Sequence, residues 1–225
     1  MSPDSNKTKA KHANTNDHSK KNIKVVFKFR GGEVNTDNLP KDVLDVRSEE
    51  RSVMFEGKTF WFSEVLGPNS NQLETYKKSC KEIIGKVLEG YNGTIFVYGN
   101  SGSGKTFTML GPDSVIEYLS SKDMFKQTID SATADKFGII LRASNEIFEL
   151  MNKGFEDKTL VGFKTNVQYF EIYWEKIYDL IEYTGESSNI KMTKTGETYA
   201  DPMTKREVTW PKDIWDILKI GQEHK

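Results

Sequence analysis

One segment with the pattern GxxxxGK[ST] restricts what this chain can fold into more than any other feature. Its residues are Gly99, Asn100, Ser101, Gly102, Ser103, Gly104, Lys105 and Thr106. Glycines let a backbone turn its N–H groups toward an anion, which creates a concave site for phosphates. In this pattern the lysine reaches the β- and γ-phosphates and the final hydroxyl binds Mg²⁺. We therefore expect the segment to bind nucleotide phosphates, with Thr106 as the metal ligand.

The residues on either side of this loop agree with that interpretation. Thr94–Tyr98 is a continuous apolar run bounded by glycines, which is typical of a strand buried on both faces in a parallel sheet. A helix is expected to begin near Gly104 and to run through Met109. The alternative is a glycine-rich turn that binds nothing, and the strand and helix around the loop argue against it.

Further hydrophobic patterns predict alternating strands and helices along the chain. We expect strands at Ile23–Phe29, Phe60–Phe62 and Phe163–Tyr169. We expect helices at Leu73–Leu88, Ile140–Met151 and Asp213–Ile220, with glycines 90, 154 and 221 as their ends. The stretch 111–136 is polar and irregular, with a short helix near Asp123–Ile129. Strands that alternate with helices indicate an α/β layered fold.

Composition excludes several classes of protein. The chain has 225 residues, 32 Lys and Arg against 33 Asp and Glu, and a net charge of −1, so it is not expected to bind nucleic acid. No apolar run is long enough to span a membrane, and no signal peptide is visible, so no membrane association is expected. A single cysteine, Cys80, excludes an internal disulfide. These features predict a soluble protein in a cytoplasmic setting.

The first 21 residues differ from the rest of the chain. They contain five Lys, two Asp and almost no apolar side chain. Such a segment cannot bury enough apolar surface to offset the entropy lost on ordering. We expect residues 1–21 to be a disordered basic tail and residues 22–225 to form the folded domain.

Several longer segments resemble the kinesin motor domain family, in the order in which that family has them. The segments are Asn22–Arg30, Phe60–Gln72, Tyr91–Met109, Gly138–Ala143 and Tyr169–Leu180. The likeness extends over about Asn22–Lys225. The resemblance implies a layered sheet of the P-loop NTPase type with helices on both faces. It also implies ATP and Mg²⁺ as cofactors, microtubules as the partner, and a cytoskeletal location.

The resemblance also implies where the nucleotide would bind. The loop Gly99–Thr106 would hold the phosphates and Mg²⁺, and the adenine would lie near Lys28, Arg30 and Phe107. The chain departs from the family at some of these places, with Lys28 for Arg, Gly31 for Pro and Phe107 for His. Further departures are Asn100 for Gln, Leu141 for Pro and Trp174 for Asn. Nucleotide binding with weaker base selectivity is the expected consequence.

The resemblance stops before the two switch regions of the family. The only Asp-x-x-Gly string is Asp135–Gly138, which follows no apolar strand. Phosphoryl transfer needs an oriented water and groups at the γ-phosphate, which the loop alone does not supply. We therefore identify no catalytic residue and leave hydrolysis open. We expect a partial motor domain, which is a truncated product, a fragment, or a chain that another chain or partner completes. The alternatives are a nucleotide-dependent binding module without hydrolysis and another P-loop NTPase.

Overall fold

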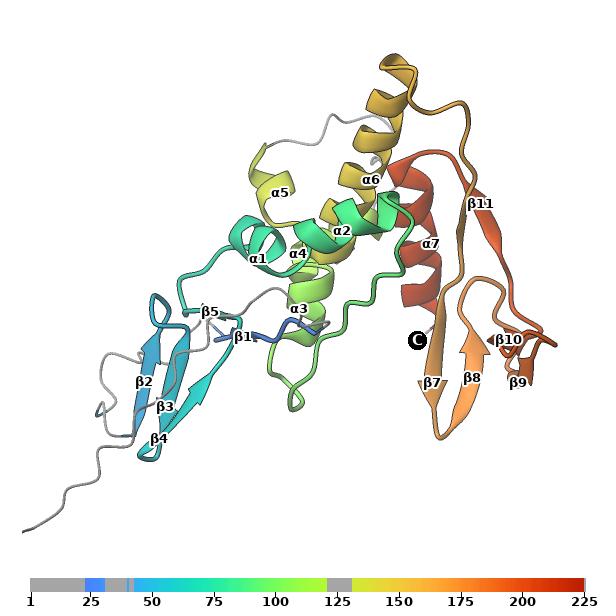
Figure 1. Cartoon of the computed structure of the whole chain (residues 1–225). Helices are drawn as coiled ribbons and strands as arrows, with labels where there is room; N and C mark the ends of the chain where they lie inside the picture. The colour runs from blue at the N-terminus through green and yellow to red at the C-terminus, as the bar shows by residue number, and fades with distance from the viewer. Residues whose placement is uncertain (1–22, 31–39, 41–42, 121–130, 225) are drawn as a thin grey trace, which may run out of the picture.

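The computed structural model describes residues 23–30, 40, 43–120 and 131–224 (Figure 1). The tail expected at 1–21 and the short helix expected near Asp123–Ile129 lie outside these residues. Helices, parallel strands and antiparallel strands occur together, which confirms the expected α/β class. No helix among the described residues is both long enough and apolar enough to cross a membrane.

Strands in the first part of the chain form two small sheets. In the first sheet, β1 (Val26–Lys28) runs parallel to β5 (Glu64–Leu66). The second sheet is an antiparallel meander of β2 (Leu44–Arg47), β3 (Ser52–Phe55) and β4 (Lys58–Trp61). The strands expected around residues 23–29 and 60–62 are thus confirmed, although both are shorter than or offset from the patterns that predicted them.

Two further sheets form in the last third of the chain (Figure 1). One pairs β6 (Thr165–Val167) with β11 (Arg206–Val208) in antiparallel register. The other is antiparallel and consists of β7 (Phe170–Tyr173), β8 (Lys176–Asp179), β9 (Ser187–Met192) and β10 (Thr198–Asp201). The alternation in 163–169 therefore predicted the place of β6 correctly.

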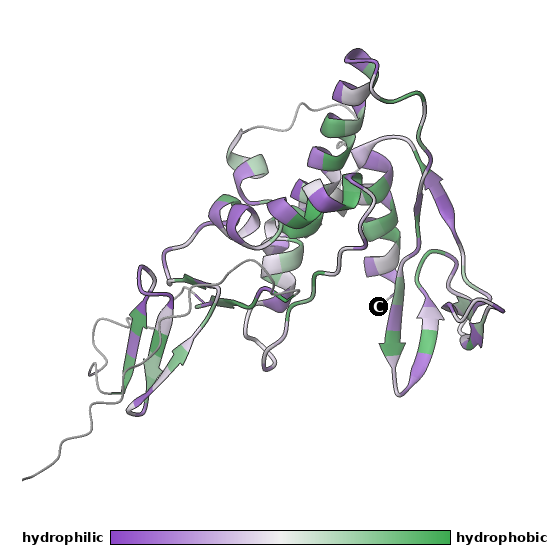
Figure 2. Cartoon of the chain, in the orientation of Figure 1, coloured by the Kyte–Doolittle hydropathy of each residue, from purple (hydrophilic) through white to green (hydrophobic). Residues whose placement is uncertain are grey.

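The largest group of helices surrounds a shared apolar core. It consists of α4 (Asp113–Ser120), α6 (Ile139–Glu156) and α7 (Pro211–Glu223), whereas the short α5 (Ser131–Asp135) has no buried residue. Apolar side chains of α4, α6 and α7 and of the loops beside them meet in one cluster: Leu110, Val115, Phe137, Leu141, Trp215 and Leu218. Figure 2 shows hydrophobic and hydrophilic residues alternating along α6 and α7 as amphipathic helices require. The helix α4 was not expected, because its sequence lies in a stretch that we interpreted as irregular.

The single helix expected over 73–88 is two helices. They are α1 (Gln72–Ser79) and α2 (Lys81–Leu88), which meet at the buried residue Cys80. Both pack on α6, and their apolar residues Tyr76, Cys80 and Ile84 form a cluster with Ile139. Apolar residues recur at the same spacing in one bent helix and in two successive helices. The pattern alone therefore did not reveal the break at Cys80.

The strand expected at Thr94–Tyr98 is wrong. This segment is extended, but it pairs with no strand among the described residues, and Phe96 and Tyr98 are 78% and 93% exposed. A strand needs a neighbour to satisfy its N–H and C=O groups. The burial on both faces that the apolar run predicted is therefore also wrong, because no described strand lies beside residues 94–98 to cover them.

Candidate functional site

The predicted phosphate-binding loop lies between the extended segment 94–98 and α3 (Lys105–Met109), where the sequence placed it. The end of α3 is fixed to the start of α6, because the Gly138 N–H donates to the Leu110 carbonyl at 2.9 Å. Thr108, in the last turn of α3, is buried. The loop itself is exposed over most of its length, so the fold holds one end of it and leaves its surface accessible.

Glycines give the loop its curvature. Gly102 and Gly104 have φ angles of 75° and 92°, in the left-handed region that favours glycine. The Ser103 N–H donates to the Asn100 carbonyl at 3.1 Å, which closes a turn within the loop. A helix that begins directly after such a turn leaves its first N–H groups without acceptors inside the helix. The backbone is therefore of the kind that can accept an anion.

Lys105 is folded back over the loop. Its Nζ donates to the carbonyls of Gly99 at 3.0 Å and Asn100 at 2.8 Å. Both acceptors are neutral, and phosphate oxygens would be stronger partners for an ammonium group. The Lys105 ammonium thus lies at the loop where it is expected to contact phosphates. The next residue, Thr106, is exposed.

The three residues expected near the base also gather at the loop. Arg30 donates from Nη1 to the Gly102 carbonyl, which brings the end of β1 against the loop. The Lys28 Nζ lies 5.2 Å from the centroid of the Phe107 ring, a cation–π contact. Burial lowers the pKa of Lys28 below its ordinary value. Phe107 itself is 44% exposed, so part of its ring remains accessible.

Sequence reasoning missed one residue of this region. Gln72, at the start of α1, is buried and donates from Nε2 to the Phe107 carbonyl at 2.6 Å. Its Oε1 is buried and has no described hydrogen-bond partner. The contact joins residues 35 positions apart, and nothing in the local pattern around residue 72 indicates it.

The donor set fits a nucleotide with Mg²⁺ better than a bound metal alone. No group of three or more His, Cys, Asp or Glu gathers among the described residues to hold a metal ion. In a Mg²⁺–nucleotide site, a hydroxyl such as that of Thr106 supplies one ligand and phosphates and waters supply others. The loop offers donors for phosphate in Lys105 and Arg30, so the residues present fit that group.

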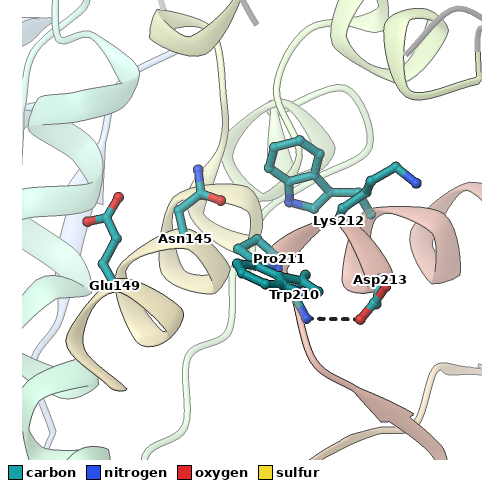
Figure 3. Close-up of a pocket in the computed structure, with 7 residues that line it drawn as sticks. Asn145, Glu149, Trp210, Pro211, Lys212 and Asp213 are labelled. Carbon is teal, nitrogen blue, oxygen red and sulfur yellow. Dashed lines mark hydrogen bonds between the residues drawn. The ribbon is translucent and has the colours of Figure 1, made fainter. Parts of the chain in front are cut away.

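A second feature lies away from the loop, between α6 and the start of α7. It is a cavity of about 670 Å³, with Asn145 and Glu149 on one side and Trp210 and Lys212 on the other (Figure 3). Trp215 also lines it. The sequence analysis singled out none of these side chains as functional. The exposed indole of Trp210 is the only signal that could have been noticed, and single exposed aromatic residues are common.

Comparisons with known proteins bear on the loop and the fold. The model of the kinesin motor domain family matches residues 3–225. The kinesin heavy chain of Strongylocentrotus purpuratus is 31% identical over 204 residues, covering 91% of this chain and 18% of that protein. Kinesin heavy chain isoform 5C of Rattus norvegicus is 33% identical over 204 residues, covering 90% of this chain and 19% of that protein. The chain therefore spans about a fifth of the length of these relatives.

A solved structure shows the same fold. It is described as that of a fast kinesin, with implications for its ATPase mechanism and its interactions with microtubules. It aligns with a TM-score of 0.70 and 24% identity, covering 89% of this chain and 52% of that chain. At this identity the likeness concerns the fold alone.

Proposed function

Because this chain belongs to the kinesin motor domain family, we propose that its Gly99–Thr106 loop binds the triphosphate of ATP together with Mg²⁺. The observation that carries this proposal is the position of Lys105. Its ammonium lies over the loop on two neutral carbonyls, at 2.8 and 3.0 Å. A triphosphate that entered the loop would replace these carbonyls with charged oxygens, which form stronger hydrogen bonds with a cation.

The remaining residues of the site have separate tasks in this proposal. Thr106 supplies a hydroxyl ligand to Mg²⁺, and loop N–H groups together with Arg30 contact the phosphates. The base lies on the accessible part of Phe107, with Lys28 beside it. Gln72 holds the Phe107 carbonyl and so fixes the backbone that carries Lys105 and Thr106.

The cellular role that follows is that of a microtubule motor segment in the cytoskeleton. Two relatives are kinesin heavy chains, and the description of the solved structure names interactions with microtubules. These statements concern those proteins, of which this chain matches a part. For this chain we propose microtubule-dependent movement that is driven by ATP.

A second candidate function is nucleotide-dependent binding without hydrolysis. The described side-chain contacts with the loop come from Lys105 and Arg30, which are donors. No carboxylate in the described part of the chain makes a hydrogen bond to the loop. A group that orients the attacking water is a usual part of phosphoryl transfer, and the second candidate rests on the donors-only character of these contacts.

Replacement of Lys105 tests nucleotide binding. We expect Lys105→Ala to weaken binding of a fluorescent ATP analogue about tenfold or more, since a hydrogen bond to a charged group contributes roughly 1.5–3 kcal/mol. Lys81→Ala removes an exposed lysine from α2 and is the matched control, with affinity expected to stay unchanged. Equal affinity of the native chain and Lys105→Ala would contradict the proposal.

The two candidate functions differ in the rate at which the chain hydrolyses ATP. A motor segment releases phosphate from ATP, and microtubules accelerate that release. A binding module retains ATP affinity, and phosphate release stays at the background rate with or without microtubules. Phosphate release and co-sedimentation with microtubules, measured on the same sample, decide between them.

A further inference from the structure

We propose that the cavity between α6 and the start of α7 binds an arginine side chain presented by a partner polypeptide. This interaction site is separate from the nucleotide loop and does not depend on the function proposed for that loop. It rests on three features of the cavity: its shape, an exposed indole and an excess of negative charge.

The cavity is an open hollow on the surface, and its volume is that of a ligand site. Its volume of about 670 Å³ lies within the range of roughly 300–1,000 Å³ that is usual for ligand pockets. Asn145 and Glu149 stand one turn apart on α6 and face it from one side, and Trp210 at the start of α7 faces it from the other (Figure 3). A guanidinium would fill part of this volume, which leaves space for neighbouring residues of a bound peptide.

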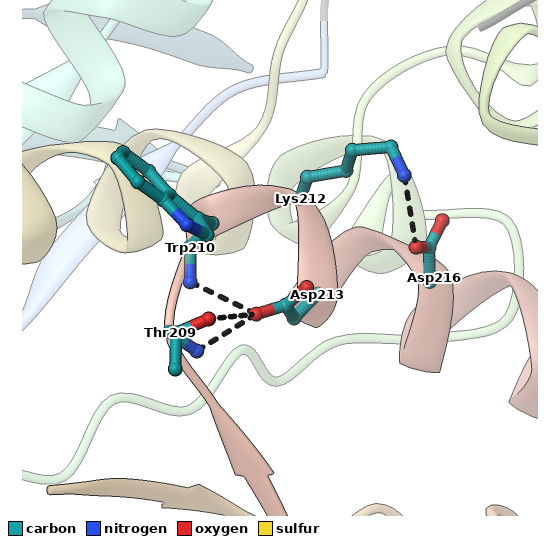
Figure 4. Close-up of polar contacts among 5 residues, drawn as sticks. All are labelled: Thr209, Trp210, Lys212, Asp213 and Asp216. Carbon is teal, nitrogen blue, oxygen red and sulfur yellow. Dashed lines mark hydrogen bonds and ion pairs between the residues drawn. The ribbon is translucent and has the colours of Figure 1, made fainter. Parts of the chain in front are cut away.

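Trp210 is 62% exposed, and its side chain does not cap the helix that it precedes. It stands at the N-cap of α7, but an indole has no acceptor with which to cap a helix. The Asp213 side chain instead bonds the backbone at the start of the helix. Its Oδ2 accepts from the Trp210 N–H at 2.9 Å and the Thr209 N–H at 2.7 Å (Figure 4). Trp215, by contrast, is buried and donates from Nε1 to the Ser144 hydroxyl. The Trp210 ring is thus available for another partner.

The charged groups around the cavity sum to a negative value. Lys212 forms an ion pair with Asp216 at 3.3 Å (Figure 4). Burial alone would raise the pKa of Asp213, but hydrogen bonds from Thr209 and Trp210 and the charge of Lys212 lower it, so Asp213 stays ionised. Glu149 makes no ion pair in the part of the chain described. Among the residues that line the cavity, the cation Lys212 and the carboxylates Glu149 and Asp213 give a charge of 1 − 2 = −1.

An exposed indole that faces a carboxylate without an ion pair across a cavity is complementary to arginine. Cations are attracted to the face of tryptophan, and arginine is the side chain most often found there. Its planar guanidinium stacks on the ring and can also donate two parallel hydrogen bonds to a carboxylate such as Glu149. The side-chain carbonyl of Asn145 can accept a further bond. Lysine offers a point charge without the planar fork, and a neutral or anionic side chain would leave Glu149 without a partner.

A titration with a short peptide tests the site. The probe is acetyl-Gly-Arg-Gly-amide, and its matched analogue carries citrulline, which has nearly the same shape and no charge. We expect the Trp210 indole N–H and α6 amide signals to shift in NMR spectra of the labelled chain and to saturate with the arginine peptide. The citrulline peptide should bind about fivefold or more weakly. Absence of saturable shifts, or equal affinity for the two peptides, would overturn the proposal.

Variants locate the binding to this cavity. Glu149→Gln changes the charge of an exposed residue, and we expect it to reduce the preference for arginine over citrulline to about twofold or less. Trp210→Ala should abolish binding and Trp210→Phe should restore part of it, which separates loss of the ring from loss of the fold. Trp174→Ala removes an exposed indole from the β7–β8 hairpin, where Trp174 is 80% exposed against 62% for Trp210. If Trp174→Ala weakens binding as much as Trp210→Ala does, the assignment to this cavity is wrong.

Discussion

At the scale of single residues, Lys28 and Phe107 form a pair that neither residue's neighbours in sequence would reveal. The ammonium of Lys28 lies 5.2 Å from the Phe107 ring centroid, and burial lowers the pKa of Lys28. Because this cation lies over one face of the ring, a base that stacked on Phe107 would displace the ammonium or use the other face. The resemblance to kinesins placed both residues near the base, whereas Gln72 was missed because its contact with Phe107 depends on tertiary folding.

Phe107→Ala should separate recognition of the base from recognition of the phosphates. We expect the affinity for ATP to fall about two- to tenfold, since stacking of aromatic rings contributes roughly 0.5–1.5 kcal/mol. The affinity for inorganic tripolyphosphate, which has no base, should stay the same. Calorimetric titrations with both ligands measure this, and Phe60→Ala, on the exposed face of β4, is the control. An equal loss for both ligands would mean that Phe107 supports the loop and does not contact the base.

At the scale of elements, glycines show how far sequence patterns can predict helix ends. Gly90 follows the end of α2 as expected, with a φ of 98° and its N–H bonded to the Val87 carbonyl. Gly154 and Gly221 were expected to end helices, and both lie inside them. A glycine can provide either a left-handed conformation or room for a close neighbour, and sequence alone does not distinguish these uses. At Gly221 the neighbour is Tyr169.

Two glycine-to-alanine substitutions with opposite outcomes follow from this difference. A Cβ at Gly221 would lie 2.1 Å from Tyr169 Cε1, so Gly221→Ala should destabilise the chain by about 1–3 kcal/mol, as overpacking does. Gly85 lies within α2, and a Cβ there would meet no atom within 4 Å. Gly85→Ala should therefore stabilise by about 0.5–1 kcal/mol. Urea unfolding midpoints measure both changes, and a neutral Gly221→Ala would show that α7 does not pack on Tyr169.

At the scale of the whole molecule, the apolar side chains of the helices are better buried than those of the strands. The helical clusters around Leu141 and Ile84 are buried, whereas the described strands divide into four small sheets. The segment 94–98 joins none of these sheets and exposes Phe96 and Tyr98. Helix packing could be predicted because its period is local, but strand pairing could not, because it depends on which segment lies alongside.

This exposed segment predicts the behaviour of the chain in solution. Unpaired backbone with exposed aromatic side chains is a template for association between molecules. We expect the chain alone to self-associate as its concentration rises, which light scattering coupled to size-exclusion chromatography measures. The double variant Phe96→Ser and Tyr98→Ser should shift the chain toward monomer, because it removes the apolar contacts that flank the unpaired backbone.

The matched control removes exposed aromatic residues where the backbone is already paired. Tyr173 and Trp174 lie at the β7–β8 hairpin, and Tyr173 pairs with Lys176 across it. Replacing both with Ser should leave self-association largely unchanged if the unpaired segment is its cause. Equal effects of the two double variants would assign association to apolar exposure in general. A native chain that stays monomeric at all concentrations would show that 94–98 is no template, and the expectation of a partner that completes the sheet would lose its support.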